Sequence, residues 1–175
     1  MASGDSLLIL TPNMAVPPAT TYAQLDVHAG ASTPAEAIPC IDFDAAASEY
    51  MDFPNLFMPE NYSDATGITL IIVFAAPGEV TATDEVRWEV ALRLIGDDID
   101  PLSTSHTYVY TGVSADPPSV ANEVAYETLA LTKGAQMDTV IAGSYFNLRI
   151  YRDHDHADDT AAGDAELFAI HIKET

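Results

Sequence analysis

Apolar and polar residues alternate one by one along residues 84–95, and the fold prediction rests on this stretch. Every second residue is apolar: Val86, Trp88, Val90, Leu92 and Leu94. The residues between them are charged or small: Arg87, Glu89, Ala91 and Arg93. This is the pattern of a strand with one buried face, whereas a helix would scatter the charges through its apolar side. We therefore expect a strand that turns Trp88 toward the core.

Short apolar or alternating segments recur along the chain, with Pro, Gly and Asp turns between them. They cover residues 6–11, 22–28, 38–43, 67–75, 106–112, 124–132, 145–152 and 165–173. Residues 45–53 are open between a helical turn, suggested by three alanines, and a strand entering a bend at Pro54. Short strands without a long helix predict an all-β fold, an antiparallel β-sandwich of jelly-roll type.

Three of these segments carry a more specific expectation. Residues 67–75 are apolar on both faces, which predicts a central strand covered on both sides or a subunit interface. In residues 145–152, Phe146, Leu148 and Ile150 should point inward. In the last segment the residues expected on one face are Phe168, Ile170 and Ile172.

The chain divides into an N-terminal arm and a main body. Residues 1–36 hold one or two short strands among prolines and small residues, so we expect an extended arm and not an independent domain. Such an arm either clasps a neighbouring subunit or closes the sheet of its own chain. Residues 37–175 should form the jelly-roll domain.

Charge is the most unusual feature of the composition. The 175 residues contain 6 Lys or Arg and 27 Asp or Glu, for a net charge of −21, while 48% of residues are hydrophobic. The apolar share is that of a globular protein, and the charge repels phosphate backbones and anionic lipid. We expect no nucleic-acid and no membrane partner. Solubility, cation binding or a basic partner each explain the acidity.

One cysteine and the N-terminal sequence bear on where the protein is made. Cys40 has an apolar context and no cysteine partner, which indicates a small core residue. The apolar run at Leu7–Leu10 is too short for a signal peptide, and Asp5 precedes it. We expect synthesis in the cytoplasm.

Residues 152–159 form the one stretch with the character of metal ligands. The candidate ligands are Asp153, Asp155, Asp158 and Asp159, whose oxygens suit calcium. His154 and His156 would suit zinc or nickel instead. EF-hand spacing and a terminal Glu ligand are missing, so a solvated acidic loop is the other interpretation.

We found no catalytic pattern. Nothing brings Glu89, Glu127 and Glu166 together as an acid–base pair, and Cys40 has no basic neighbour in the sequence. Nucleophile elbows, phosphate loops and zinc-protease motifs are also missing. The sequence therefore favours a protein that is not an enzyme.

Tyrosines on the expected strands raise a carbohydrate-binding alternative, because sugar rings stack on flat aromatic faces. The candidate platform residues are Tyr108, Tyr110, Tyr145 and Tyr151. Tyrosine is also routine in β-sheets, so a purely structural role remains the other interpretation. Trp88 does not join the platform, since it lies on the inward face.

Several stretches resemble a family of proteins from tailed bacteriophages and prophages. They are LLILTP, PPATTYAQLDVH, CIDFDAAASEYMDF, MPENY, DEVRWEVAL, GAQMDTV and the closing LRIYRD…DDTAAGDAELFAIHIKET. The resemblance implies a non-enzymatic structural protein of the virion, a capsid decoration or a head or tail appendage, made in the host cytoplasm. It further implies a homotrimer that docks on a major capsid or tail protein. The alternative is a carbohydrate- or receptor-binding module at a fibre tip, with a host-surface glycan as ligand.

Overall fold

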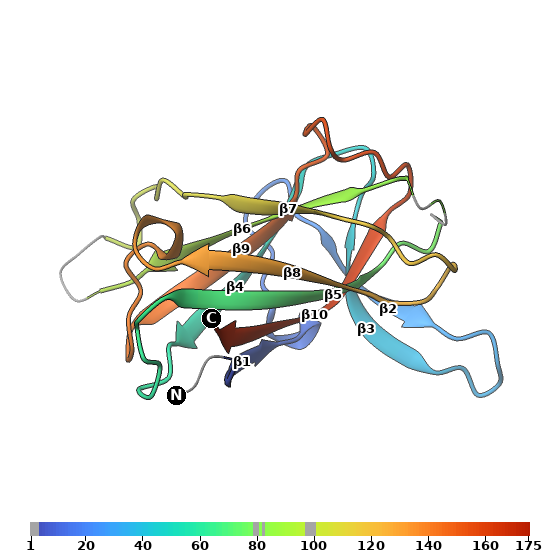
Figure 1. Cartoon of the computed structure of the whole chain (residues 1–175). Coiled ribbons are helices and arrows are strands. Elements are labelled where there is room, and N and C mark those ends of the chain that lie inside the picture. Colours follow the sequence, from blue (N-terminus) through green and yellow to red (C-terminus); the bar gives the residue numbers. More distant parts are fainter. Residues whose placement is uncertain (1–3, 79–80, 82, 97–100) are drawn as a thin grey trace.

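The computed structural model describes residues 4–78, 81, 83–96 and 101–175, which form two antiparallel β-sheets packed face to face (Figure 1). Sheet A has six strands: β2 (Gln24–Ala29), β3 (Ala37–Phe43), β10 (Ala165–Glu174), β5 (Gly67–Ala75) and β8 (Ala125–Thr132) in that order, with β1 (Ser6–Leu10) also paired to β10. Sheet B has four strands in the order β4 (Glu49–Phe57), β9 (Tyr145–Arg152), β6 (Val86–Leu94) and β7 (Thr111–Ala115). Two short 3-10 helices, η1 (Pro12–Met14) and η2 (Ala135–Met137), lie in connections.

The chain passes back and forth between the two sheets. From β3 onward, every connection except that from β6 to β7 crosses from one sheet to the other. Neighbours within a sheet are therefore distant in sequence, as where β10 lies between β3 and β5. This topology confirms the predicted antiparallel β-sandwich of jelly-roll type. Among the described residues, no helix has the length and apolar character needed to cross a membrane.

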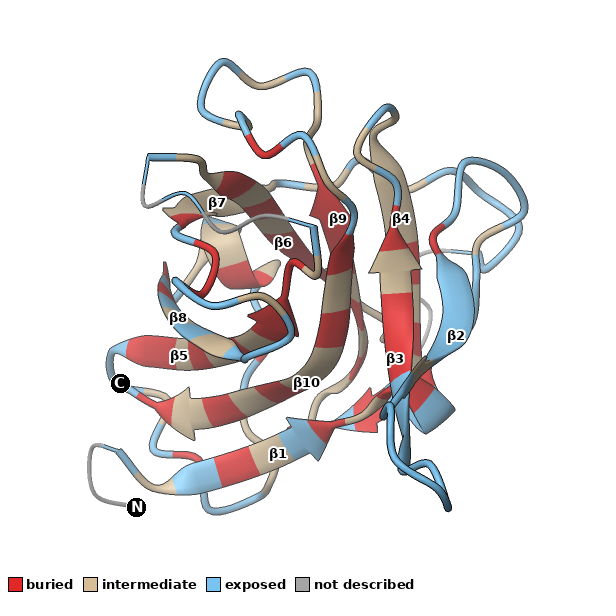
Figure 2. Cartoon of the chain, turned by 90° about the vertical axis from the view of Figure 1, so that its right-hand side faces the viewer, coloured by how far each residue is buried: buried red, intermediate tan, exposed pale blue. Residues whose placement is uncertain are grey.

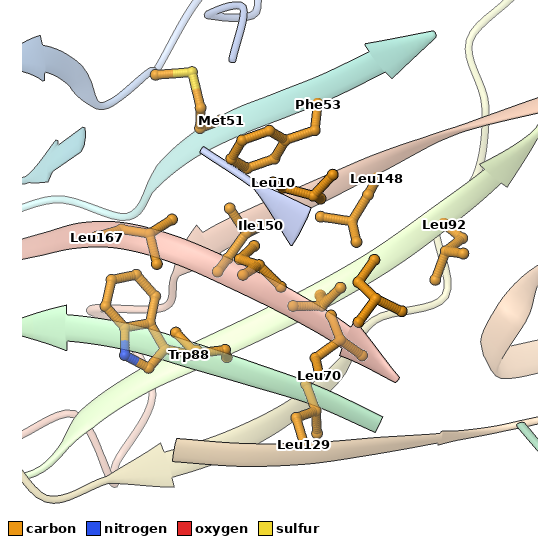
Figure 3. Close-up of a cluster of buried hydrophobic side chains, with 14 of the residues drawn as sticks. Leu10, Met51, Phe53, Leu70, Trp88, Leu92, Leu129, Leu148, Ile150 and Leu167 are labelled. Carbon is orange, nitrogen blue, oxygen red and sulfur yellow. The ribbon is translucent and has the colours of Figure 1, made fainter. Parts of the chain in front are cut away.

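Strand β6 behaves as its alternation predicts. Val86, Trp88 and Val90 are fully buried between the sheets, and Leu92 is 1% exposed. Figure 3 shows Trp88 and Leu92 within the cluster of buried side chains. The Trp88 ring meets Phe43 and Phe74 edge to face, at centroid distances of 5.0 and 5.6 Å. These aromatic contacts fix Trp88 at the centre of the core.

Burial alternates along most strands of both sheets (Figure 2). On the central strand β5, Ile68, Leu70, Ile72 and Phe74 are fully buried. The residues between them on β5 face out and are half-buried, Ile71 and Val73 included. The outer surface of sheet A is thus apolar at its middle.

The structure corrects two expectations about local conformation and decides one that the sequence left open. Residues 106–110 are not a strand, and β7 begins only at Thr111. Residues 49–57, which include the ambiguous stretch, form β4, and this strand continues past Pro54 through a register shift between Phe53 and Leu56. On β10 a second register shift lies between Leu167 and Ala169, so Leu167 points into the core and Phe168 does not. A bulge inserts one residue and reverses the inward face, which strict alternation cannot anticipate.

Residues 4–36 pair with the sheets of their own chain. Strand β1 pairs with β10, and its Leu7 and Leu10 belong to the buried core. Bridges at Val16 and Tyr22 hold the next segment beside β4. Strand β2 then pairs with β3 at the border of sheet A. Strands β1 and β2 thus pair within sheet A of their own chain, and clasping of a neighbouring subunit stays a prediction.

Candidate functional site

A layer of tyrosine rings covers part of the outer surface of sheet B. Tyr50 of β4 and Tyr151 of β9 are stacked, with centroids 4.6 Å apart and planes inclined by 23°. Tyr110 meets Tyr151 edge to face at 4.8 Å, and Tyr108 lies 5.8 Å from Tyr110. We call this region the tyrosine face and define it as Tyr50, Asp52, Tyr108, Tyr110, Arg149 and Tyr151.

Strand geometry explains how these residues meet. On β4 and β9 the core residues Met51 and Ile150 are opposite each other, so their neighbours Tyr50 and Tyr151 both point outward. Tyr108 and Tyr110 come from the segment before β7. His106 helps to hold this segment, because its Nε2 lies 3.4 Å from Asp138 Oδ2.

Arg149 connects the polar and aromatic parts of the face. Its Nε and Nη2 donate to the two carboxylate oxygens of Asp52 at 2.6 and 2.8 Å. Its guanidinium also lies over the ring of Tyr108, 4.4 Å from the centroid, and 5.7 Å from that of Tyr50. The hydrogen bonds to Asp52 raise the pKa of Arg149 above its usual value. A paired, stacked guanidinium is a rigid donor that holds the surrounding rings in place.

Three tyrosines of this face have a raised pKa: Tyr108, Tyr110 and Tyr151. Burial raises the pKa of Tyr108 and Tyr110, and the nearby Arg149 opposes the shift. Burial and a hydrogen bond to Glu89 raise the pKa of Tyr151, whose hydroxyl donates to Glu89 Oε2 at 3.0 Å. The hydroxyls of Tyr108, Tyr110 and Tyr151 are therefore neutral at physiological pH, and a neutral hydroxyl is both a donor and an acceptor.

The outer surface of β4 and β9 continues from the tyrosine face to a more exposed aromatic pair. Phe57 is 62% exposed and packs at 5.0 Å against Tyr145. Between this pair and Asp52, the Asn55 backbone amide donates to Asn147 Oδ1 at 3.0 Å, and the Tyr145 hydroxyl bonds the Asn55 side chain. From Tyr145 to Tyr151 the strand spans about 20 Å. We call Asn55, Phe57, Tyr145 and Asn147 the Phe57 end.

The bulge on β4 brings Asn55 into this position. Asn55 has a φ of +61°, a left-handed conformation that Asn tolerates better than most residues. It lies within the register shift between Phe53 and Leu56. The register shift turns the Asn55 side chain toward the outer surface. Bulges often redirect a side chain in this way beside functional sites.

The structure brings three of the four predicted platform tyrosines together. Tyr108, Tyr110 and Tyr151 are brought together, and Tyr145 lies at the other end of β9. The sequence prediction missed Tyr50 and Asp52, because residues 45–53 were not assigned to a strand. The alternation of these two residues with Met51 and Phe53 is the signal that would have identified them.

Asp159, one of the four candidate calcium ligands, is used in a buried ion pair. Its Oδ2 and Oδ1 accept from Arg152 Nε and Nη2 at 2.9 and 2.8 Å, and both side chains are 0% exposed. Asp159 Oδ2 also accepts from the Arg87 amide at 2.9 Å, and Arg152 donates to the Ala161 and Gly163 carbonyls. This pair fastens the loop between β9 and β10 to the sandwich.

The other three candidate ligands do not converge with Asp159. Asp153 accepts a hydrogen bond from the Ser48 hydroxyl at 3.4 Å, while Asp155 and Asp158 are exposed. In the part of the chain that the structure describes, no group of three or more His, Cys, Asp or Glu side chains is placed to hold a metal ion. Calcium binding here stays a prediction from the sequence.

An acidic pocket that the sequence did not reveal lies on the other sheet. Asp42, Asp164 and Glu166 line a pocket of about 450 Å³ beside Pro77 and Gly78. Burial, followed by the charges of Asp164 and Glu166, raises the pKa of Asp42 to about 6. Glu166 also lies 2.7 Å from His28 Nδ1. Asp42 is far in sequence from Asp164 and Glu166, and it lies beside them because β3 pairs with β10, with Asp42 opposite Glu166.

The candidate acid–base residues remain separate. Glu89 lies on sheet B, paired with Arg87 at 3.3 Å, whereas Glu127 and Glu166 lie on sheet A. The two on sheet A belong to β8 and β10, which flank β5 on opposite sides. The structure therefore does not bring Glu89, Glu127 and Glu166 together as an acid–base pair.

Comparison with known proteins gave similarities of structure alone. No protein-family model and no curated protein matches the sequence. Among solved structures, a family 35 carbohydrate-binding module from Clostridium thermocellum is similar with a TM-score of 0.51 and 12% identity, over 95% of this chain and 98% of that one. A xylan-binding module, CBM15, has a TM-score of 0.42 and 15% identity over 97% of both chains. A carbohydrate-binding module specific for non-crystalline cellulose, CBM28, has a TM-score of 0.44 and 8% sequence identity, over 99% of each of the two chains.

The first of these similarities defines the class of fold. The chain is a jelly-roll β-sandwich of the kind found in carbohydrate-binding modules. At 12% identity the likeness concerns the fold and leaves the binding chemistry to this chain's own residues.

Proposed function

We propose that this protein is a non-catalytic carbohydrate-binding module, and that a glycan chain lies along β4 and β9 on the tyrosine face and the Phe57 end. The observation that carries the proposal is the layer of Tyr50, Tyr108, Tyr110 and Tyr151 around Arg149. Sugars present apolar C–H faces and a rim of hydroxyls. A binding surface therefore needs flat rings and fixed polar groups side by side.

Polar groups for the sugar hydroxyls are available along the whole face. Asp52 and Arg149 lie at the tyrosine face, and Asn55 and Asn147 lie toward Phe57. Carboxylate, guanidinium and amide groups are planar and supply donors and acceptors in fixed directions. Because these side chains already bond one another, little conformational entropy remains to be lost on binding.

The charge of the face supports a neutral or weakly charged ligand. Of the 6 basic residues in the chain, Arg87, Arg93 and Arg149 point outward on β6 and β9 of sheet B. Arg87 pairs with Glu89 and Arg149 with Asp52, which balances the charge locally within a strongly acidic protein. Such a surface does not repel neutral sugars, and the rest of the molecule keeps polyanions away.

A glycan array followed by calorimetric titration of the best ligand tests this proposal. Replacing Phe57 or Tyr108 by Ala should weaken binding by about tenfold or more, since each ring contributes on the order of 1 kcal/mol or more by stacking. Tyr126→Ala is the matched control, because Tyr126 is 69% exposed on β8 of the other sheet. Binding to no glycan, or equal losses in all three variants, would refute the proposal.

A structural role in a phage virion is the second candidate. Its support is the sequence resemblance together with the apolar outer surface of sheet A, where Ile71, Val73 and Phe168 are half-buried and Ile9 is 59% exposed. In this proposal the protein self-associates as a trimer and docks on a major capsid or tail protein. Its presence at fixed stoichiometry in purified particles, seen by electron microscopy, supports this role; its absence from them argues against it.

A further inference from the structure

We propose that strand β2 pairs with the β2 strand of a second copy, joining the two A sheets across a two-fold axis. This inference is independent of glycan binding. Strand β2 forms the border of sheet A, and among the described elements β3 alone pairs with it. Figure 2 shows β2 almost entirely exposed, and Leu25 and Val27 are 54% and 48% exposed. A two-stranded ribbon that buries so little is marginal in water by itself.

The hydrogen-bond pattern identifies which amides are free to pair. The Gly30 amide donates to the Glu36 carbonyl at 2.8 Å across the hairpin. Bonding to β3 recurs at every second residue of an antiparallel ladder, so the amides of Leu25, Val27 and Ala29 point to the open border. Pro39, which has no amide hydrogen, is opposite Val27 and agrees with this assignment.

One of the outward-pointing amides of β2 already has a hydrogen-bond acceptor. The Val27 amide, at the middle of the outward set, donates to the side chain of its neighbour Asp26 at 2.7 Å. One side-chain acceptor protects a border strand only weakly against pairing with another strand. Proteins usually prevent such pairing with lysines, prolines or an element that covers the border. Displacing it frees both the amide and the carboxylate.

Charge selects one register for a two-fold pairing. Centring the axis on Val27 places Val27 opposite its own copy, Leu25 opposite Ala29, and Asp26 opposite His28. All three outward-pointing amides of each strand then find carbonyl partners. Centring the axis on Asp26 would instead place two carboxylates in contact, and centring it on His28 two imidazoles. The Val27 register alone pairs opposite charges and buries apolar side chains together.

In the Val27 register, His28 of one copy lies beside Asp26 of the second copy. His28 Nδ1 already lies 2.7 Å from Glu166 Oε2, so donation to a second carboxylate must use Nε2. The charged or titratable groups around His28 are Glu166 on β10, Asp26 on β2, and Asp42 and Cys40 on β3. We expect association to strengthen at higher ionic strength, because salt screens the repulsion between two acidic chains.

Sedimentation and cysteine cross-linking test the pairing and its register. In sedimentation equilibrium over about a hundredfold range of concentration, the protein should pass from monomer to dimer. Val27→Cys should give a disulfide-linked dimer under mild oxidation, because cross-strand partners lie about 5.5 Å apart. Ala29→Cys is the matched control, since the two Ala29 positions would be offset by about 13 Å. The native Cys40 is fully buried and stays reduced.

The outcomes separate clearly. A dimer that cross-links at least about tenfold more through Val27→Cys than through Ala29→Cys supports the proposal. A protein that stays monomeric at all concentrations and salt levels overturns it, as does a trimer. Equal cross-linking by the two variants overturns the register.

Discussion

Arg149 on β9 and Asp52 on β4 form a two-point ion pair across neighbouring strands, with Nε to Oδ1 at 2.6 Å and Nη2 to Oδ2 at 2.8 Å. Both side chains are about four-fifths buried, at 21% and 23% exposed. The pair fixes the plane of the guanidinium over Tyr108. The aromatic layer on sheet B therefore depends on a polar contact between two strands.

We expect Asp52→Asn to weaken glycan binding more than it weakens the fold. The amide keeps one hydrogen bond to Arg149 and loses the charge, so the guanidinium gains freedom above the tyrosines. The free energy of unfolding should fall by about 1 kcal/mol, and the dissociation constant should rise by about tenfold. Calorimetric titration and urea denaturation measure the two quantities. Asp116→Asn, an exposed site after β7, is the control and should change neither.

Breaking the buried pair between Arg152 and Asp159 should destabilise the protein strongly. Arg152→Met leaves the Asp159 carboxylate buried without its partner, and removes the donors to the Ala161 and Gly163 carbonyls. The expected loss in the free energy of unfolding is about 3–5 kcal/mol. Urea denaturation measures it, with Asp158→Asn as a control at a 54% exposed side chain. A loss below about 1 kcal/mol would show that the pair does not hold the loop.

Asp42 should make stability depend on pH in mildly acidic solution. Its pKa is raised from 3.8 to about 6, so the folded state holds a proton that the unfolded state releases. The free energy of unfolding should therefore fall as pH rises between these two values, and the lost stability should not return above them. Asp42→Asn removes this contribution. The variant should be more stable than the natural protein at neutral pH and gain nothing at about pH 4. Parallel stability curves from denaturation at several pH values would contradict this assignment.

Trp88→Ala should leave a large cavity between the sheets. Trp88 is fully buried and its ring packs against Phe43 and Phe74. The expected loss is about 3–5 kcal/mol, while Trp88→Phe should cost less because a ring remains. Chemical denaturation of both variants provides the measurement. Similar losses for the two would mean that the indole does not fill this space.

The pattern of side chains predicted the sandwich because it directly reports burial. The inward set from Val86 to Leu92 follows from alternation alone, and so does the outward set that carries Arg149 and Tyr151. The bulge on β10 places Leu167 in the core instead of Phe168. It depends on how β10 pairs with β5, and the alternation of apolar and polar residues does not reveal it. Strand existence is thus easier to predict from sequence than the face that a bulged strand presents.

The candidate site was less accessible to prediction, since it depends on which strands become neighbours. Tyr151 and Tyr110 were identified as members of a possible platform, but their contact with Tyr50 requires β4 beside β9. The candidate ligand Asp159 lies in an acidic loop with exposed neighbours, but its own side chain is buried and pairs with Arg152 seven positions earlier. Spacing alone does not distinguish a buried ion pair from a solvated carboxylate.

The central claim is that sugars bind to the outer surface of sheet B. Its most direct test is a titration of the isotopically labelled protein with the best glycan from the array, followed by backbone amide shifts. Binding on sheet B should give saturable shifts along β4, β9 and residues 106–110, with β8 and β5 unchanged. Shifts confined to sheet A or to the loop between β9 and β10, or no shift with any glycan, would contradict it.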